Sequence, residues 1–189
     1  MNSFFAVINR MKYINRWGLM RNRERENLQE HSYQTAVLAH ALAVIENQKF
    51  GADVNPERAA VMALYHDSSE IITGDMPTPV KYSNETLTSS YKQIETEARN
   101  IILKKLEPDL RPAFSEIFNC EESPEWVFVK AADTLSAYIK CIEEIKAGND
   151  EFVGARDAIE QKLLHNNLKS LKYFIKTYLP AFKLTLDEQ

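Results

Sequence analysis

Start and stop signals for helices recur along the whole chain, and the stretches between them are longer than ordinary strands. Asn27 is suited to cap a helix, and Glu30 follows three residues later, which is the pattern of a capping box. Asn55-Pro56 places a proline where the first turn of a helix accepts it, and Gly148 stands where another helix has to stop. No stretch alternates apolar and polar residues between paired turn signals. The sequence therefore predicts an all-α fold.

The predicted helices follow one another with short connections. They cover residues 2–13, 27–48, 55–74, about 87–106, 110–118 and 124–148, with one or two more within 150–178. Proline and glycine lie between these segments without forming a linker, and no internal repeat or low-complexity segment is present. A chain of 189 residues can bury a sizeable core, so we expect residues 1–189 to form one compact domain.

Composition argues against several classes of function. The formal net charge is −4 and no block of like charge occurs, so we expect no nucleic-acid polymer as partner. No apolar run approaches the ~20 residues that span a bilayer, and the apolar stretch near the N-terminus is too short for a signal peptide. Cys120 and Cys141 form no CxxC pair and are expected as free thiols. These features predict a cytoplasmic protein that does not use a membrane.

The most unusual stretch is "YHDSSEIITGDMPTPVKY", in which an apolar helix runs into acidic residues. His66 and Asp67 stand near the expected helix end, and Glu70 follows at a spacing that places it on the same helix face. One His-Asp pair is weak evidence, because a partly exposed helix end carries the same residues. The prolines of segment 74–83 prevent it from remaining helical, so we expect a stiff loop beside the pair.

Two residues elsewhere make the pair a candidate metal site. His31 lies in the first turn of the preceding long helix, and Asp133 lies in an otherwise apolar helix where a lone carboxylate is costly to bury. Imidazole with carboxylate suits Mn, Fe, Co, Ni, Cu or Zn. Pairing of Asp133 with an Arg or Lys is the alternative. His40 lies about half a turn around the helix from His31, so we expect it to be packed or hydrogen-bonded, and we expect His165 on the surface.

Arg16 and Trp17 lie between two predicted helices and are followed by a glycine. A guanidinium beside a flat aromatic wall can bind a phosphate group. The alternative is a surface arginine next to a core tryptophan. We expect Arg21, Arg23 and Arg25 to form a solvated face.

The order His…His-Asp…Asp is similar to that of the HD-domain superfamily of metal-dependent phosphohydrolases. A closer resemblance is to the bacterial 5′-deoxynucleotidases of the YfbR type, in the segments "INRWGLMRN", "ENLQEHSYQTA", "YHDSSEIITGDMPTPVKY", "KAADTLSAYIKC" and "LPAFKLTLDE". It covers essentially the whole chain in the same order and is thinnest from residue 84 to 125. The resemblance implies a compact, all-helical HD domain that forms a homodimer.

The resemblance also implies a role for each motif residue. The metal ligands would be His31, His66, Asp67 and Asp133, and the metal would be a divalent transition ion such as Co, Mn or Cu. Glu70 would stand beside the water that the metal activates, and Asp75 would serve in proton transfer to the leaving oxygen or in sugar binding. Arg16 and Trp17 would contact the substrate phosphate. The substrate site would further include His31, Asp67, Asp75, Met76, Pro77, Thr78 and Asp133.

The implied reaction is hydrolysis of 2′-deoxyribonucleoside 5′-monophosphates to deoxynucleoside and phosphate, with loose base preference. One alternative is an HD hydrolase for another nucleotide, such as a cyclic nucleotide or guanosine tetraphosphate, against which the loop "TGDMPTPVKY" argues. The other is a non-catalytic metal or nucleotide sensor. Glu70 argues against a sensor, because the metal does not need it as a ligand.

Overall fold

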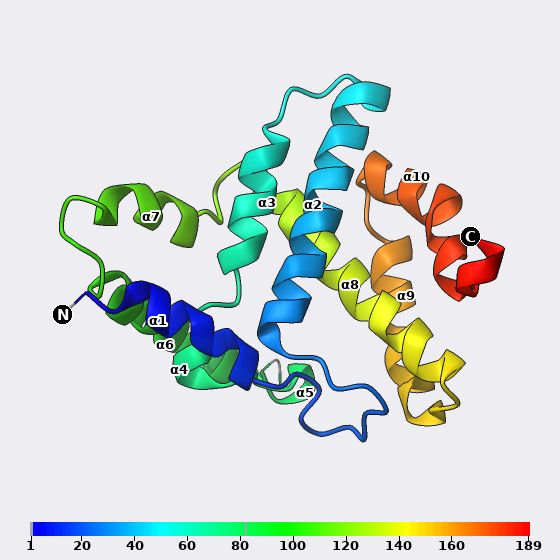
Figure 1. Cartoon of the computed structure of the whole chain (residues 1–189), viewed down its shortest axis with the longest axis horizontal. Helices are drawn as coiled ribbons and strands as arrows, with labels where there is room; N and C mark the ends of the chain where they lie inside the picture. Colours follow the sequence, from blue (N-terminus) through cyan, green and yellow to red (C-terminus); the bar gives the residue numbers. More distant parts are fainter. Residues whose placement is uncertain (1, 82) are drawn as a thin grey trace.

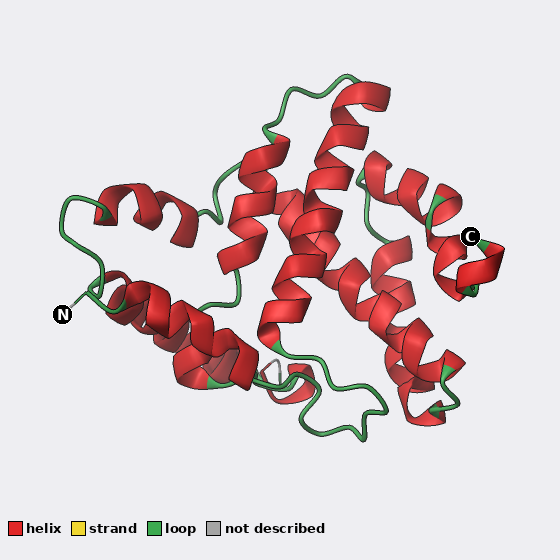
Figure 2. Ribbon diagram, viewed as in Figure 1, coloured by secondary structure: helices red, strands yellow, loops and turns green. Residues whose placement is uncertain are grey.

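A computed structural model describes residues 2–81 and 83–189, and all regular structure within them is helical (Figures 1 and 2). The α-helices are α1 (Phe4–Ile8), α2 (Leu28–Phe50), α3 (Pro56–Tyr65), α4 (Glu70–Thr73), α5 (Thr78–Lys81), α6 (Glu85–Leu103), α7 (Arg111–Phe118), α8 (Trp126–Lys146), α9 (Val153–Leu164) and α10 (Lys169–Thr177). Short 3-10 helices are η1 (Asn9–Tyr13), η2 (Asp150–Phe152), η3 (Leu179–Lys183) and η4 (Leu186–Glu188). The predicted all-α fold is confirmed. Tyr82, the last residue of the "YHDSSEIITGDMPTPVKY" motif, lies outside the described residues.

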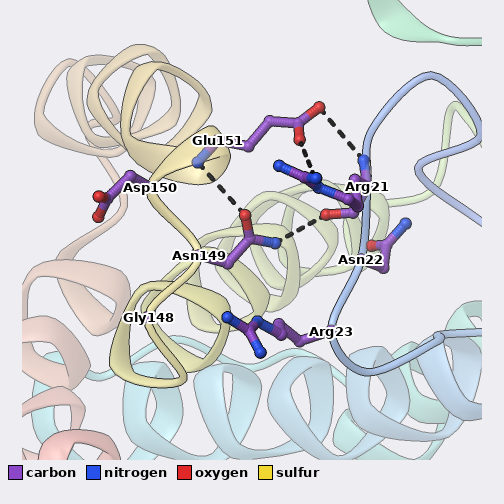
Figure 3. Close-up of a pocket in the computed structure, with 7 residues that line it drawn as sticks. All are labelled: Arg21, Asn22, Arg23, Gly148, Asn149, Asp150 and Glu151. Carbon is purple, nitrogen blue, oxygen red and sulfur yellow. Dashed lines mark hydrogen bonds and ion pairs between the residues drawn. The ribbon is translucent and has the colours of Figure 1, made fainter.

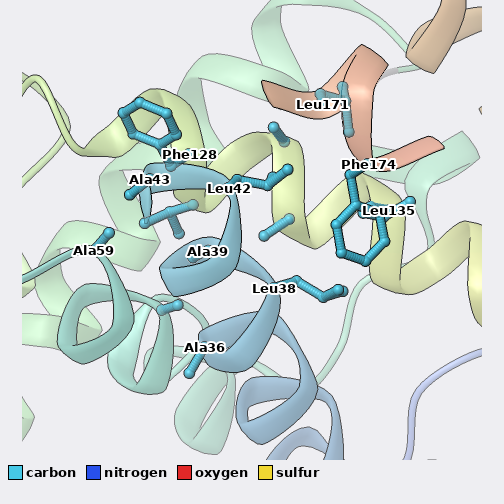
Figure 4. Close-up of a cluster of buried hydrophobic side chains, with 14 of the residues drawn as sticks. Ala36, Leu38, Ala39, Leu42, Ala43, Ala59, Phe128, Leu135, Leu171 and Phe174 are labelled. Atoms are coloured by element: carbon cyan, nitrogen blue, oxygen red, sulfur yellow. The ribbon is translucent and has the colours of Figure 1, made fainter. Parts of the chain in front are cut away.

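Helices α2, α3 and α8 form the centre of the molecule, with α9 and α10 beside them (Figure 1). Their buried side chains make the main core, in which Leu42 of α2 and Leu135 of α8 are fully buried (Figure 4). Alanines such as Ala39 and Ala59 allow these helices to pack closely. Replacing one buried leucine by alanine in such a core typically costs about 2–5 kcal/mol. This packing fixes the positions of α2 and α8 relative to each other.

A second apolar cluster supports the lower end of α3. Phe4, Ile102 and Phe118 are buried there, and Tyr65, the last residue of α3, packs against them. The rings of Tyr65 and Phe118 have centroids 5.5 Å apart. The cluster thereby anchors the point at which α3 ends and the His66-Asp67 pair begins.

The two predicted helix caps, Asn27 and Asn55, agree with the structure. The side chain of Asn27 accepts hydrogen bonds from Gln29 N and Glu30 N, and Glu30 reaches back to Asn27 N, so the capping box is formed. Asn55 caps α3 by accepting from Arg58 N at 2.8 Å. Helix α6 begins two residues before the expected Leu87, because Asn84 caps it.

The prediction of one helix from 55 to 74 is wrong, because the chain leaves α-helical geometry at 66–69. The ring Nδ1 of His66 bonds the carbonyl of Ala63 at 2.7 Å. Bonds that span three residues follow, from Ser68 N to Tyr65 O and from Glu70 N to Asp67 O. They tighten the chain into a corner, so the His-Asp pair lies in a turn between α3 and α4.

The prediction that segment 74–83 has no helix is also wrong, because α5 covers Thr78–Lys81. Val80 N and Lys81 N both bond to the carbonyl of Pro77, at 2.8 and 3.0 Å. Pro79 is tolerated because the first turn of a helix needs no bond from its backbone nitrogen. Residues 74–77 remain a loop, as expected.

Two further expectations concern the whole chain. No helix in the described ranges is both long enough and apolar enough to cross a membrane. Cys120 and Cys141 are buried free thiols, as predicted.

Candidate metal centre and substrate pocket

The structure brings together the four residues that were expected to bind metal. His31 comes from the first turn of α2, His66 and Asp67 from the turn after α3, and Asp133 from α8. His31 Nε2 lies 3.2 Å from Asp133 Oδ1 and 3.5 Å from Asp67 Oδ2. His66 Nε2 lies 3.1 Å from Asp67 Oδ2 and 4.0 Å from Asp133 Oδ1. Ligand atoms of His31, His66 and Asp133 all lie within 4.8 Å of one another.

Both imidazole rings are oriented by hydrogen bonds from their outer nitrogens. Ser136 Oγ bonds Gln34 Oε1 at 2.6 Å, so the serine hydroxyl is the donor there and accepts from His31 Nδ1 at 3.2 Å. His66 Nδ1 donates to Ala63 O. Each ring thus turns an Nε2 lone pair toward the carboxylates, and His66 Nε2 is buried without a hydrogen-bond partner in the described part of the chain. Lone pairs facing carboxylates at these distances fit a bound cation.

The charges around the cluster also favour a cation. Burial and Arg16 lower the pKa of His31, but Asp133 and Asp67 outweigh them and raise it above its ordinary value. Burial alone would raise the pKa of Asp67, yet the neighbouring His66 and His31 hold it well below its usual range. Two nitrogen and two oxygen donors in this field form a set that suits a divalent transition metal.

Asp133 combines the two roles considered for it. Its Oδ1 faces His31, while Oδ2 pairs with Lys130 at 3.2 Å. The lysine side chain is half exposed, so the pair lies at the edge of the cluster. Burial opposes ionisation of Asp133, but His31 and Lys130 outweigh it and lower the pKa of the carboxyl group.

Glu70 is buried at the first position of α4, beside Asp67 and Asp75. Its Oε2 atom has no hydrogen-bond partner among residues 2–81 and 83–189. Burial, followed by the charges of Asp67 and Asp75, raises the pKa of Glu70 well above its ordinary value. A solvated glutamate at a partly exposed helix end would show none of these features.

Arg16 lies between two carboxylates. Its Nε donates to Glu26 Oε2 at 3.0 Å and its Nη1 to Asp67 Oδ2 at 3.3 Å. Burial would lower the pKa of Arg16, but Asp67, Asp133 and Glu26 outweigh it and raise the pKa. With 13 % of its side chain exposed, Arg16 is not the surface arginine of the alternative interpretation.

Trp17 forms a wall next to Arg16. Its indole Nε1 donates to the same Glu26 Oε2 at 3.0 Å, and its ring lies 5.2 Å from that of Phe152. Its φ of 60° is in the left-handed region, which bulky side chains rarely adopt. Trp17 is half-buried, so it is not the core tryptophan of the alternative either.

A pocket of about 360 Å³ opens beside the four residues expected to bind metal; Asp133 is one of its lining residues, and Arg16 is another. Trp17, Asp75, Pro77 and Thr78 line it as expected, whereas His31, Asp67 and Met76 are not among its lining residues. Its other walls are Gly18, Leu19, Met20, Pro79, Thr134, Ala137, Ala155, Ala158, Ile159 and Lys162. The pocket therefore has a charged end at the cluster and a mostly apolar end against α9. The sequence carried no signal for the α9 wall, because its alanines are ordinary helix residues.

A second hollow, of about 530 Å³, lies between residues 21–23 and residues 148–151 (Figure 3). None of the cluster residues lines it. Asn149 Nδ2 donates to Arg21 O at 2.7 Å, and Glu151 accepts from Arg21 N at 3.2 Å. These contacts hold the loop that follows Trp17 against the end of α8. Arg21, Arg23 and Arg25 are exposed, as predicted.

The remaining histidines lie away from the cluster. His165 is exposed, as predicted. His40 was expected to be packed or hydrogen-bonded, but it is exposed, so the expectation that it is packed is wrong.

Solved structures of HD-domain phosphohydrolases share this fold. An HD-domain phosphohydrolase from Listeria innocua has a TM-score of 0.82 and 24 % identity, over 95 % of this chain and 88 % of that one. The cyanophage S-2L HD phosphohydrolase DatZ, solved with dA and one catalytic Zn²⁺ ion, has a TM-score of 0.68 and 20 % identity, over 95 % and 96 % of the two chains. The fold is therefore that of an HD-domain phosphohydrolase.

Sequence comparison narrows this class to one family. The family model described as 5′-deoxynucleotidase YfbR-like matches residues 3–182. A 5′-deoxynucleotidase of Vibrio cholerae is 48 % identical over 187 residues, which are 98 % of this chain and 96 % of that protein. One from Erwinia tasmaniensis is 46 % identical over 98 % of this chain and 94 % of that protein. The chain belongs to the YfbR-like 5′-deoxynucleotidase family, as its motifs predicted.

Proposed function

We propose that this protein hydrolyses 2′-deoxyribonucleoside 5′-monophosphates to deoxynucleoside and phosphate. The observation that carries the proposal is the convergence of two imidazole Nε2 atoms, two carboxylates and the Arg16 guanidinium beside one end of a pocket whose other end is mostly apolar. A phosphate fits the charged end and a nucleoside the apolar end. Relatives named 5′-deoxynucleotidase, at 46–48 % identity, support this substrate class.

The proposed ligands of the metal are His31, His66, Asp67 and Asp133. A donor set of two nitrogens and two oxygens favours a transition metal such as Co, Mn or Cu over Mg or Ca. The zinc in DatZ belongs to the same group of metals. When bound, such an ion polarises a phosphate oxygen and lowers the pKa of water.

The chain's own residues supply the remaining steps. Arg16 donates hydrogen bonds to phosphate oxygens and offsets charge that builds on them. Glu70 accepts a proton from the attacking water, and the burial of its carboxylate beside Asp67 supports this role. Asp75 protonates the leaving 5′ oxygen. The position of Asp75 in the lining of the pocket supports this role, and burial raises its pKa against the opposing effects of Arg16 and the Trp17 backbone N–H.

The apolar end of the pocket supports loose base preference. Ala155, Ala158 and Ile159 offer contact surface and no side-chain hydrogen-bonding groups that would select one base. The proposed wall against C2′ of the sugar consists of Trp17 and residues 75–78, of which Asp75, Pro77 and Thr78 line the pocket. An added hydroxyl at C2′ would meet this wall.

Release of phosphate from dAMP, with and without a chelator, tests the proposed function. The metal-loaded protein should release phosphate from dAMP faster than from AMP, lose this activity with the chelator and regain it when metal is returned. Activity on cyclic nucleotides or guanosine tetraphosphate with none on dAMP would favour another HD hydrolase. Binding of dAMP without phosphate release would favour a sensor.

We further propose that the chain forms a single HD domain and acts in the cytoplasm as a homodimer. The family match from 3 to 182 supports the single domain, and the free thiols support a location in the cytoplasm. Near the C-terminus, Phe174 and Phe182 pack in or against the core, whereas Tyr178 is 46 % exposed and free to take part in a contact between subunits. Exposed apolar side chains on α2 and α3, including Val37 and Leu64, support an apolar contact. Light scattering should give twice the chain mass, and unfolding should show one cooperative transition.

A further inference from the structure

The carboxylate of Glu26 contacts the two residues of the Arg16-Trp17 pair at once. Its Oε2 atom accepts from Arg16 Nε and from Trp17 Nε1, both at 3.0 Å. The side chains of Arg16 and Glu26 are only 13 % and 11 % exposed, so water screens the contact little. A surface ion pair would explain neither the burial nor the shared oxygen atom.

The backbone holds Glu26 in register with Arg16. Arg16 N donates to Glu26 O at 2.9 Å, and Leu28 N donates to Ile14 O at 3.0 Å. Asn15 and Asn27 form the isolated bridge between these two bonds. Glu26 also precedes Asn27, the cap of α2, so the start of a long helix fixes its position.

The contact defines how Arg16 presents its donors. A guanidinium is planar and carries five N–H groups, of which Glu26 takes the one at Nε and Asp67 takes one at Nη1. Carboxylates on two sides of the group fix its plane. Because Arg16 also lines the pocket, the other N–H groups of Nη1 and Nη2 are the ones that can meet a phosphate.

Trp17 depends on several contacts to keep its orientation. A non-glycine residue in the left-handed region is strained and persists only where its surroundings hold it. The bond from indole Nε1 to Glu26, the ring of Phe152 and the bond from Met20 N to Trp17 O at 2.9 Å are such constraints. Among these three, Glu26 is the one that also holds Arg16.

We propose that Glu26 is a positioning residue for substrate binding. Its carboxylate fixes the plane of Arg16 for the phosphate and the ring of Trp17 for the sugar. It acts through these two side chains and does not itself line the pocket. The inference rests on the proposed function for its substrate. It requires that phosphate binding and sugar selection change together when Glu26 is altered.

The test compares Glu26→Ala and Glu26→Gln with Glu24→Ala, which removes an exposed carboxylate from the same loop. The readouts are kcat/KM for dAMP and AMP, inhibition by inorganic phosphate, bound metal and Tm. Glu26→Ala should lower kcat/KM for dAMP by about 10- to 100-fold, the scale of a misplaced binding group. It should also weaken phosphate inhibition and narrow the dAMP-to-AMP ratio, with bound metal unchanged. Glu26→Gln keeps an acceptor oxygen and should retain most of the activity, and Glu24→Ala should match the wild type.

Normal kinetics in Glu26→Ala would overturn the inference, as would equal damage in Glu26→Gln and Glu26→Ala. Loss of metal and a large fall in Tm in both variants would show a purely structural role and overturn it as well. Phosphate binding by the wild type gives a readout that does not depend on turnover. If the wild type does not hydrolyse dAMP but Glu26→Ala still weakens phosphate binding, the proposed function fails and the positioning role stands.

Discussion

Nε2 of His31 lies 3.2 Å from Oδ1 of Asp133, a contact that joins the first turn of α2 to α8. Both helices belong to the main core, and Ser136, one turn beyond Asp133, orients the His31 ring through Nδ1. The cluster therefore inherits its geometry from core packing. The residues that surround it determine what the site can do, and they can be changed one at a time.

Arg16→Lys should not preserve function, although it keeps the charge. Lysine lacks the planar fork that meets Glu26, Asp67 and a phosphate at the same time. The expected loss of transition-state stabilisation is about 2–4 kcal/mol, the range for removal of one preorganised donor at a reacting oxyanion. Steady-state kinetics on dAMP measure it. A near-normal kcat/KM in the lysine variant would contradict the role of Arg16.

Trp17→Leu should narrow the dAMP-to-AMP ratio of kcat/KM, because a smaller side chain leaves room for a 2′-hydroxyl. Trp17→Phe retains a ring while losing the N–H that bonds Glu26, so it should keep more of the selectivity. Initial rates on both substrates give the ratio. A constant ratio with both activities reduced would mean that Trp17 shapes the phosphate site alone.

Acid should destabilise the protein partly through Glu144, which is 1 % exposed. It accepts from Lys140 Nζ at 2.6 Å, Arg23 N at 2.9 Å, Glu24 N at 3.0 Å and Asn149 Nδ2 at 2.6 Å. Burial opposes these bonds, but together they lower the pKa of Glu144 from 4.5 to about 2. The folded state therefore binds a proton on Glu144 less tightly than the unfolded state does. The stabilisation from the ionised carboxylate is complete above about pH 4.5 and is lost as the pH falls to about 2.

The size of this contribution is about 3 kcal/mol in the free energy of unfolding. Urea unfolding should show that the free energy of unfolding falls less between pH 6 and pH 3 in Glu144→Gln than in the wild type. Glu97→Gln, which changes an exposed glutamate of α6, is the control and should follow the wild type. Parallel acid profiles for Glu144→Gln and the wild type would refute the assignment.

The residues of the cluster could be predicted from the sequence because their chemistry is unusual in its surroundings. A carboxylate inside an apolar helix, as at Asp133, needs a partner, and the caps at Asn27 and Asn55 fixed where two of the helices begin. Periodicity could not reveal the corner at 66–69, because it depends on a ring nitrogen of His66 that competes for a backbone carbonyl. The same limit applies to α5, where a proline is tolerated in a first turn.

Glu26 could not be distinguished from its neighbours by composition. The segment "RNRERE" has the charge pattern of a solvated face, and three of its arginines are indeed exposed. Only the pairing of residues 15 and 27 brings Glu26 back to Arg16. The α9 wall of the pocket is similar, because Ala155 and Ala158 acquire a role through tertiary packing alone.

The most direct test of the account measures bound metal and dAMP turnover on the same samples of Asp67→Ala and Glu70→Ala. Asp67→Ala removes a proposed ligand, so metal and turnover should be lost together. Glu70→Ala should retain metal and substrate binding while kcat falls by roughly 10²–10⁴, the usual effect of losing a positioned acid or base. Loss of metal from Glu70→Ala would make Glu70 a ligand or a support of the ligands. Full turnover in Glu70→Ala would contradict the proposed mechanism.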